Sequence, residues 1–242
     1  MTRMQWLAVF CGVLGTATFA RAGDPRPTGF QDESEAGVVI ISGNAKSQSY
    51  HLAQTNHYYW PEDLAKLHAE FLKTQSGDVE TARAWALGLR YERNLSEDLS
   101  ALAGELVESN IFAGYRQRYS TDLGGKYHFL NGGGWNGSGE AGYRYTLENR
   151  ESSQTFDNYL RFYAELARAL AADVSAKLWA EYLPNLTHSD DYQFNSELSV
   201  SAALSSIFSL KTAYLMKYRG VPTGVLGEKT DSTFTAALVA KF

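Results

Sequence analysis

Cysteine is almost absent from this chain of 242 residues, which contains Cys11 and no other. A single cysteine cannot build a disulfide framework, so the fold needs other means of stabilisation. Long hydrophobic runs are absent as well, because no stretch reaches the roughly 18 consecutive apolar residues of a membrane-spanning helix. The only candidate, residues 6–19, is shorter and lies at the N-terminus. The sequence therefore excludes a disulfide-rich domain and a polytopic helical membrane protein.

The chain contains fewer basic residues than acidic ones. Lysine and arginine total 22 against 27 aspartates and glutamates, which gives a net charge of -5. Proteins that hold nucleic acid through its phosphates are basic on the binding face, so we expect no nucleic-acid partner. Aromatic residues are plentiful, at 13% with 15 tyrosines. Aromatic side chains favour strands, so this composition indicates a protein rich in β-structure.

Two glycine-rich segments resemble nucleotide-binding motifs, but the residues around them exclude both. Gly132, Gly134 and Gly137 spell G-x-G-x-x-G, but a strand pattern follows them where a dinucleotide site needs a helix. A glycine-rich turn is the better interpretation. The segment from Gly224 to Thr230 resembles a phosphate-binding loop, yet Glu228 stands where lysine is required. There is also no G-x-S-x-G nucleophile elbow.

The histidines predict no metal site. His51 and His57 share one face of an expected strand but lie six residues apart, about 20 Å at the rise of a strand. That separation is too large for one ion. The other three, His68, His128 and His188, stand alone in the sequence and are expected to be structural or solvated. We therefore predict no catalytic, cofactor-binding or metal-binding residues and no cofactor.

The first 22 residues have the pattern of an export signal. Arg3 supplies a positive start, residues 6–19 an apolar centre, and Ala20-Arg21-Ala22 the small residues that signal peptidase reads. Cleavage is expected before Gly23. The mature protein would then be acidic and free of cysteine.

Strict alternation of apolar and polar residues runs through the rest of the chain. In the last segment Phe234, Leu238 and Phe242 lie on one face, and Asp231 and Lys241 lie on the other. This period of two is typical of a strand with one apolar face. About twelve such segments are expected, at 33–43, 46–59, 64–74, 82–93, 98–109, 118–130, 138–148, 157–169, 173–184, 190–203, 206–219 and 230–242.

The lengths and connections of these segments favour a membrane barrel over a soluble sandwich. Most segments are longer than the ~5–6 residues of soluble strands and match the ~9–11 residues that cross a bilayer at a tilt. Connections after even-numbered strands, such as 60–63 and 94–97, are short, whereas several after odd-numbered strands, such as 75–81 and 220–229, are longer. Outer-membrane barrels have this asymmetry. The exceptions are a short first connection, at 44–45, and a long turn at 131–137.

A helical alternative exists for residues 164–183, which are rich in alanine and leucine. Charge pairing favours two strands there, because one register sets Arg161 opposite Glu181 and Glu165 opposite Lys177. Loop centres chosen in the same way extend this pairing along the chain. They set Lys177 opposite Glu197, Glu197 opposite Lys211, Lys217 opposite Asp231, Leu198 opposite Leu210 and Tyr214 opposite Phe234.

Aromatic residues gather near the ends of the expected strands. Bands of aromatic side chains at the two membrane interfaces are typical of transmembrane barrels. The alternative explanation is that tyrosine and tryptophan favour strands in general. The residues concerned are Tyr58, Tyr59, Trp60, Trp85, Trp135, Tyr182, Tyr192 and Tyr218.

Several short motifs resemble a known family. They include Ser42-Gly43-Asn44, Gly88-Leu89-Arg90-Tyr91-Glu92, Glu140-Ala141-Gly142-Tyr143-Arg144-Tyr145, Phe208-Ser209-Leu210-Lys211 and the terminal Lys241-Phe242. In these motifs the chain, from about Gly29 to its end, resembles the domain-of-unknown-function family of salt-induced outer membrane proteins, the YdiY-like family. The resemblance implies an outer-membrane β-barrel of a Gram-negative bacterium. It supplies no catalytic or ligand-binding residues.

The sequence thus predicts an all-β protein, a transmembrane antiparallel up-and-down β-barrel of about twelve strands. Residues 1–22 are the signal peptide, 23–32 a short N-terminal periplasmic segment, and 33–242 the barrel. Charges facing lipid would cost a few kcal/mol each, so the charged face should line the lumen. There we expect a ladder of charges that pair with one another, formed by Arg161, Glu165, Lys177, Glu181, Glu197 and Lys211.

Such a nearly neutral wall predicts a narrow or closed passive pore with weak ion selectivity, or an envelope protein of structural or osmotic-stress function. The alternative is an outer-membrane enzyme acting on lipid or cell-wall material, because catalytic triads are recognised by geometry and not by spacing. The expected partners are outer-membrane lipid and, during biogenesis, the barrel-assembly machinery. Phe242, an aromatic residue at the C-terminus, is the expected assembly signal. We expect a monomer.

Overall fold

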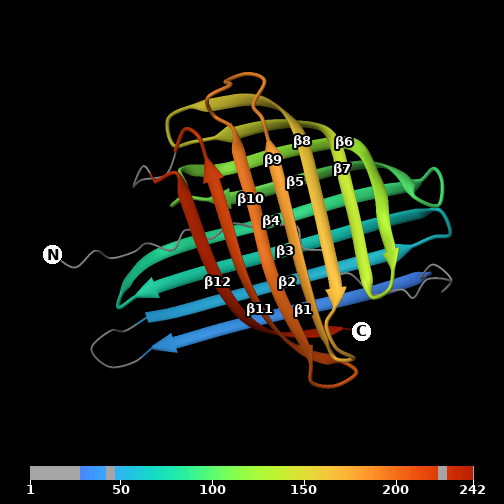
Figure 1. Cartoon of the computed structure of the whole chain (residues 1–242). Helices are drawn as coiled ribbons and strands as arrows, with labels where there is room; N and C mark the ends of the chain where they lie inside the picture. Colours follow the sequence, from blue (N-terminus) through green and yellow to red (C-terminus); the bar gives the residue numbers. More distant parts are fainter. Residues whose placement is uncertain (1–27, 42–46, 223–227, 242) are drawn as a thin grey trace.

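The chain folds into a closed antiparallel β-barrel, seen in a computed structural model that describes residues 28–41, 47–222 and 228–241 (Figure 1). The strands are β1 (Gly29–Ile41), β2 (Ser47–Tyr59), β3 (Asp63–Ser76), β4 (Val79–Asn94), β5 (Leu99–Asn110), β6 (Tyr115–Gly132), β7 (Trp135–Asn149), β8 (Gln154–Ala169), β9 (Val174–Leu183), β10 (Gln193–Ala203), β11 (Phe208–Arg219) and β12 (Thr230–Lys241). Each strand pairs with its neighbours in sequence, and β1 pairs with β12 to close the ring.

Every predicted strand is present, and the fold class is confirmed. The segment 164–183, for which a helix was the alternative, lies in β8 and β9. Among the described residues no helix is long and apolar enough to cross a membrane. The strand ends differ from the predicted bounds by a few residues. The difference at β1 changes the expected division of the chain: β1 begins at Gly29, so residues 29–32 form part of the barrel wall and not of the preceding segment.

The two ends of the barrel carry different connections. At one end the even-numbered strands are followed by short turns, at 60–62, 95–98, 133–134, 170–173 and 204–207. At the other end the connections range from the tight turn of Gly77 and Asp78 to the long loops 184–192 and 220–229. The expected long connection at 131–137 is wrong, and so is the one expected between β3 and β4. Glycines with positive φ (62° at Gly77 and Gly133, 78° at Gly134) allow both hairpins to close within two residues.

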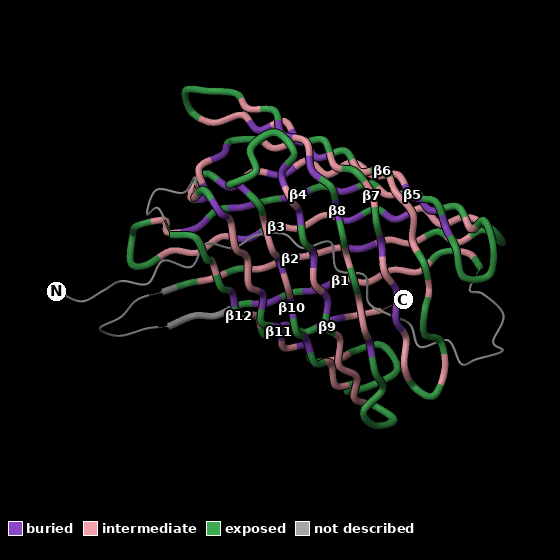
Figure 2. The backbone as a smooth tube through the Cα atoms, turned by 45° about the horizontal axis from the view of Figure 1, so that its top comes forward, coloured by how far each residue is buried: buried purple, intermediate pink, exposed green. Residues whose placement is uncertain are grey.

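Side chains alternate across the wall as the sequence predicts. Outward residues are apolar and exposed, for example Leu89 at 58% and Phe234 at 66%. Inward residues are mostly polar or charged and buried, which appears as the regular change of colour along each strand in Figure 2. An inward side chain in a wide water-filled lumen would be accessible to solvent, yet Glu148 is only 2% exposed. The interior is therefore filled by its own side chains.

Aromatic side chains mark both ends of the outward surface. Near the short turns, Tyr58 and Trp60 make an edge-to-face contact with ring centres 4.5 Å apart. Near the long loops, Tyr192 lies between Tyr182 and Tyr218, at 6.2 and 5.4 Å. Tyr59, which the sequence also assigned to this set, faces inward instead and stacks on His57. Two separated aromatic bands are the arrangement expected for a wall that crosses a bilayer.

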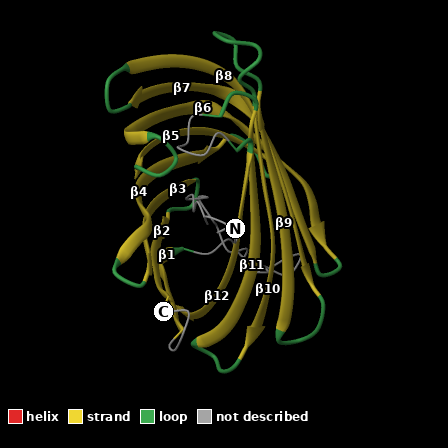
Figure 3. Ribbon diagram, turned by 90° about the vertical axis from the view of Figure 1, so that its left-hand side faces the viewer, coloured by secondary structure: helices red, strands yellow, loops and turns green. Residues whose placement is uncertain are grey.

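The wall bends where β6 and β7 pair. Strands β1 to β5 cross β8 to β12 at a steep angle, and β6 and β7 curve from one group to the other (Figures 1 and 3). At this bend Gly124 lies directly opposite Gly142, both facing inward. A Cβ atom on Gly124 would come within 2.6 Å of the carbonyl oxygen of Ala141. Only glycine permits this close approach of the two backbones.

Candidate functional site

The barrel interior collects most of the charged side chains of the strands, including the six of the expected ladder. All six face inward from β8 to β11. Arg161 Nε donates to Glu181 Oε1 at 2.7 Å, and Lys177 Nζ lies 2.9 Å from Glu165 Oε2. Lys211 Nζ instead donates to Glu35 Oε2 at 2.9 Å, across β12. Glu197 is 4% exposed and forms no ion pair or hydrogen bond among the described residues.

The strand registers differ from several that charge pairing suggested. Glu181 lies opposite Tyr163, and Lys177 lies opposite Ser199, each two residues from the expected position. Glu197 lies opposite Leu215, four residues from Lys211. The expected pairing of Leu198 with Leu210 is therefore also wrong. The register of β11 and β12 is confirmed, since Lys217 lies opposite Asp231 and Tyr214 opposite Phe234.

At the centre of the interior, ion pairs connect strands that are not neighbours. Arg90 on β4 donates to both carboxylate oxygens of Glu140 on β7, at 3.1 and 2.6 Å, past β5 and β6. Glu140 also accepts from Arg161 at 2.5 Å, and Glu181 lies 3.3 Å from Arg144. Bidentate arginine and carboxylate pairs of this kind hold both groups in a fixed geometry. No pattern in the sequence predicts the pairing of Arg90 with Glu140.

A second set of ion pairs lies toward the long loops. Glu148 on β7 accepts from Arg118 on β6 at 2.6 Å and from Arg219 on β11 at 3.3 Å. Arg219 also pairs with Asp191 in the connection between β9 and β10, at 2.6 Å. These contacts connect the long loop 184–192 to β11 and, through Arg219, to β7.

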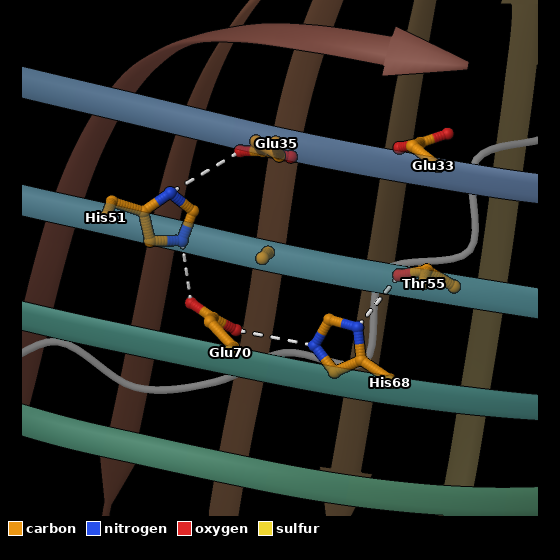
Figure 4. Close-up of a pocket in the computed structure, with 7 residues that line it drawn as sticks. Glu33, Glu35, His51, Thr55, His68 and Glu70 are labelled. Carbon is orange, nitrogen blue, oxygen red and sulfur yellow. Dashed lines mark hydrogen bonds and ion pairs between the residues drawn. The ribbon is translucent and has the colours of Figure 1, made fainter. Parts of the chain in front are cut away.

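A small cavity lies on the lumen face of β1, β2 and β3 (Figure 4). His51 Nε2 lies 2.9 Å from Glu70 Oε1, and the other oxygen of Glu70 lies 3.5 Å from His68 Nε2. Thr55 Oγ1 hydrogen-bonds His68 Nδ1 at 2.9 Å. Glu35 Oε1 approaches His51 Nδ1 at 3.7 Å. The space enclosed, about 20 Å³, is enough for one water molecule.

The contacts from Thr55 to His68 and from His68 to Glu70 have the arrangement of a catalytic triad, in which a hydroxyl nucleophile contacts a base and the base contacts a carboxylate. The surroundings do not suit catalysis, however, because Thr55 is only 6% exposed and its strand is paired on both sides. Backbone N–H groups that take part in strand pairing cannot also form an oxyanion hole. Within the described parts of the chain, no group of three or more histidine, cysteine or acidic residues could hold a metal ion.

Two histidines expected to stand alone have partners. His68 shares Glu70 with His51, and His188 Nδ1 lies 2.9 Å from Asp157 Oδ1. Thr55 lies directly opposite His68 in the pairing of β2 with β3. The sequence held one signal for this cluster, the short turn 60–62, which limits the possible registers of the hairpin.

The comparisons with known proteins agree with this architecture. The family model described as "Protein of unknown function, DUF481" matches residues 34–242. The fold is similar to that of the NanC porin, at 13% identity and a TM-score of 0.54 over 88% of this chain and 98% of that one. It is also similar to the COG4313 outer membrane channel from Pseudomonas putida F1, at 12% identity and 0.53 over 94% and 98%. No curated protein sequence matches the chain.

Proposed function

The chain belongs to the DUF481 family of proteins of unknown function, and from that premise we propose that it is an outer-membrane β-barrel with a narrow passage for small solutes. The observation that carries the proposal is the interior, where buried charges from distant strands pair with one another. Leu89 and Phe234 show the opposite face, which exposes apolar side chains. A closed wall with an apolar outside and a polar inside is suited to a bilayer.

The interior limits what can pass. Arg90 and Glu140 connect β4 to β7, and Arg219 and Glu148 connect β11 to β7. An open channel at these levels requires side chains to separate or water to enter between them. Because the positive and negative groups of the interior pair with one another, neither cations nor anions should be strongly favoured overall. Small uncharged or weakly charged solutes fit this passage best, and an envelope role in osmotic stress is compatible with it.

The proposal includes the export and assembly of the protein. Residues 1–22, the expected signal peptide, and Phe242, the expected assembly signal, lie outside the described residues. We propose export across the inner membrane, insertion by the barrel-assembly machinery and a monomeric state in outer-membrane lipid. The fold resemblance to a porin and an outer-membrane channel supports this location.

Conductance across a planar lipid bilayer tests the proposed passage. We expect small or infrequent openings for the purified, refolded protein. Replacing both Arg90 and Glu140 by alanine removes the pair that spans β5 and β6, and should raise the unitary conductance severalfold. Arg83→Ala is the matched control, because Arg83 pairs at the surface with Glu80 and its side chain is 54% exposed. A double variant with the conductance of the unaltered protein would contradict the proposal.

A hydrolase of lipid or cell-wall material is the second candidate function, favoured only by the contact of Thr55 with His68 beside Glu70. Release of fatty acid from phospholipid by the folded protein would support it, provided that His68→Ala abolishes the release. Unaltered phospholipid after prolonged incubation would count against it.

A further inference from the structure

The outward surface of β1 and β2 carries a group of four polar side chains. This polar patch consists of Asp32, Ser34, Gln54 and Asn56. Asp32 lies directly opposite Asn56, and Ser34 lies directly opposite Gln54. Glu33 and Thr55, the residues next to them in sequence, line the lumen cavity (Figure 4). Because successive side chains of a strand point to opposite faces, the polar patch faces the bilayer, and its four side chains are half-buried.

Apolar side chains border the polar patch on the same face. Phe30 and Tyr58 form the next outward pair toward the short turns, and Ala36 and Leu52 form the next outward pair in the opposite direction. The neighbouring strand β3 contributes Leu67. The polar patch therefore interrupts a wall that is otherwise suited to lipid. Polar groups in such a place are costly unless a partner satisfies them.

The hydrogen bonds within the polar patch lead to Asp32. Ser34 Oγ donates to Gln54 Oε1 at 2.6 Å, and Gln54 Nε2 donates to Asp32 Oδ1. Within the described residues, the second oxygen of Asp32 and the side-chain amide of Asn56 have no hydrogen-bond partner, and Asp32 forms no ion pair. The polar patch thus holds an uncompensated negative charge with an unpaired amide beside it.

The polar patch begins just inside the aromatic band at the short-turn end. Asn56 is two residues from Tyr58, about 7 Å along the strand and less along the membrane normal because the strands tilt. Aromatic side chains of such bands lie at the level of the lipid headgroups. Asp32 is therefore within reach of a headgroup. Short turns of outer-membrane barrels face the periplasm, so this headgroup belongs to the periplasmic leaflet.

The chemistry of the polar patch selects a positively charged headgroup that carries N–H donors. The carboxylate of Asp32 attracts a cation and repels an anionic lipid. A primary ammonium group can donate one hydrogen bond to Asp32 Oδ2 and another to the amide oxygen of Asn56. A quaternary ammonium group has no proton to donate. The amide nitrogen of Asn56 remains available to donate to a phosphate oxygen of the same headgroup.

We propose that the polar patch binds a phospholipid with a primary ammonium headgroup, held by Asp32 and Asn56 in the periplasmic leaflet. Gln54 and Ser34 position the carboxylate of Asp32. The bound ammonium group offsets the cost of placing this charge on a lipid-facing surface. The site rests on the proposed membrane location, and it adds to that location a lipid of defined headgroup at one place on the wall.

Native mass spectrometry of the unaltered protein, refolded in detergent, measures which lipids remain bound. Phosphatidylethanolamine, phosphatidylcholine and phosphatidylglycerol with the same acyl chains are added in separate arms. One molecule of phosphatidylethanolamine should bind with an affinity about tenfold higher than that of either other lipid, because it forms a charge-assisted hydrogen bond. Equal retention of the three lipids would overturn the site, and this measurement requires no variant to fold.

Two variants locate the preference on the wall. Asp32→Asn removes the charge, keeps the shape of the side chain and should abolish the preference for phosphatidylethanolamine. Glu105→Gln is the matched control, because Glu105 also faces outward, opposite Leu89, and accepts a hydrogen bond from Thr121 at 2.6 Å. It should keep the preference. Heat modifiability on a gel verifies that both variants are folded. An undiminished preference in Asp32→Asn, or an equal loss in Glu105→Gln, contradicts the site.

A second copy of the chain is the competing occupant of the polar patch. A dimer without bound lipid that Asp32→Asn dissociates would overturn the lipid site. Failure of the site and failure of the proposed function are distinguishable. A protein that conducts but shows no headgroup preference loses the site alone. A protein that retains phosphatidylethanolamine but never conducts keeps the site and loses the passage.

Discussion

Several inward charges of this barrel pair with residues on strands that are not their neighbours: Arg90 on β4 with Glu140 on β7, and Lys211 on β11 with Glu35 on β1. Alternation along β9 predicts correctly that Lys177 and Glu181 share a face. It cannot predict that Arg90 meets Glu140, fifty residues away, because two strands separate them and no sequence period links them. Lys211 illustrates the same limit, since its partner is Glu35 at the far end of the chain.

We expect the buried pair formed by Lys211 and Glu35 to stabilise the barrel. Reversing either charge alone, by Lys211→Glu or Glu35→Lys, should lower the free energy of unfolding by about 3–5 kcal/mol, because it leaves like charges buried together. The double reversal should recover part of that loss. Urea titration of the refolded protein in lipid vesicles measures all three variants. Purely additive losses would show that the two groups do not interact.

Glu197 supplies the contrast, because it is buried and has no partner among the described residues. Replacing it by the neutral isostere, Glu197→Gln, should leave the free energy of unfolding unchanged or raise it. The same titration checks this. A loss as large as that of Lys211→Glu would mean that Glu197 supports the fold through a contact that its surroundings do not reveal.

At the level of the strand, faces are easier to predict than registers. The register of β8 with β9 differs from the charge-based expectation by two residues, and that of β10 with β11 by four. Both register differences are an even number of residues, so each side chain stays on its predicted face and the prediction of an inward charged face remains correct. Registers depend on how each turn closes, and the turns after β8 and β10 lack the positive-φ glycines that mark the turns after β3 and β6.

We expect the bend in β6 and β7 to require glycine at position 124. Gly124→Ala should strongly reduce the yield of folded barrel, because its Cβ would lie 2.6 Å from the Ala141 carbonyl oxygen and 2.9 Å from the Gly142 Cα. The matched control is Gly125→Ala at the next position, where the nearest atom is 3.8 Å away. Folded yield after refolding into detergent, measured by circular dichroism, compares them. Equal yields would show that the wall can bend without glycine.

For the whole molecule, closure depends on a short seam. Among the residues that the structure describes, β1 and β12 pair from Glu33 to Ala36 and from Leu238 to Lys241, whereas β1 and β2 pair along their full lengths. Lys241 Nζ lies 3.3 Å from Glu33 Oε2 and adds an ion pair to the seam. Pairing of the last strand with the first could be predicted from sequence, because a barrel in lipid must leave no open edge. The length of this pairing could not be predicted from sequence, because it depends on the tilt of the strands accumulated around the wall.

Heat modifiability on a denaturing gel tests this closure. The unboiled protein should migrate faster than the boiled one, since a closed hydrogen-bonded wall resists detergent at room temperature. Deleting residues 238–242 removes the β12 side of the seam and should abolish the fast-migrating form after refolding. A truncated protein that remained fully heat-modifiable would show that the ring does not depend on these pairs.

Deleting Phe242 alone separates assembly from closure. The shortened protein keeps the pairs that the structure describes at the seam, from Leu238 to Lys241, and should still refold in detergent into a heat-modifiable barrel. In cells, loss of the terminal aromatic residue should reduce the folded protein in the outer-membrane fraction several-fold and increase its degradation in the periplasm, while export across the inner membrane continues. Fractionation followed by immunoblotting measures both. If the shortened protein reaches the outer membrane at the normal level, Phe242 is not the assembly signal, and the barrel-insertion machinery must recognise the preceding part of β12.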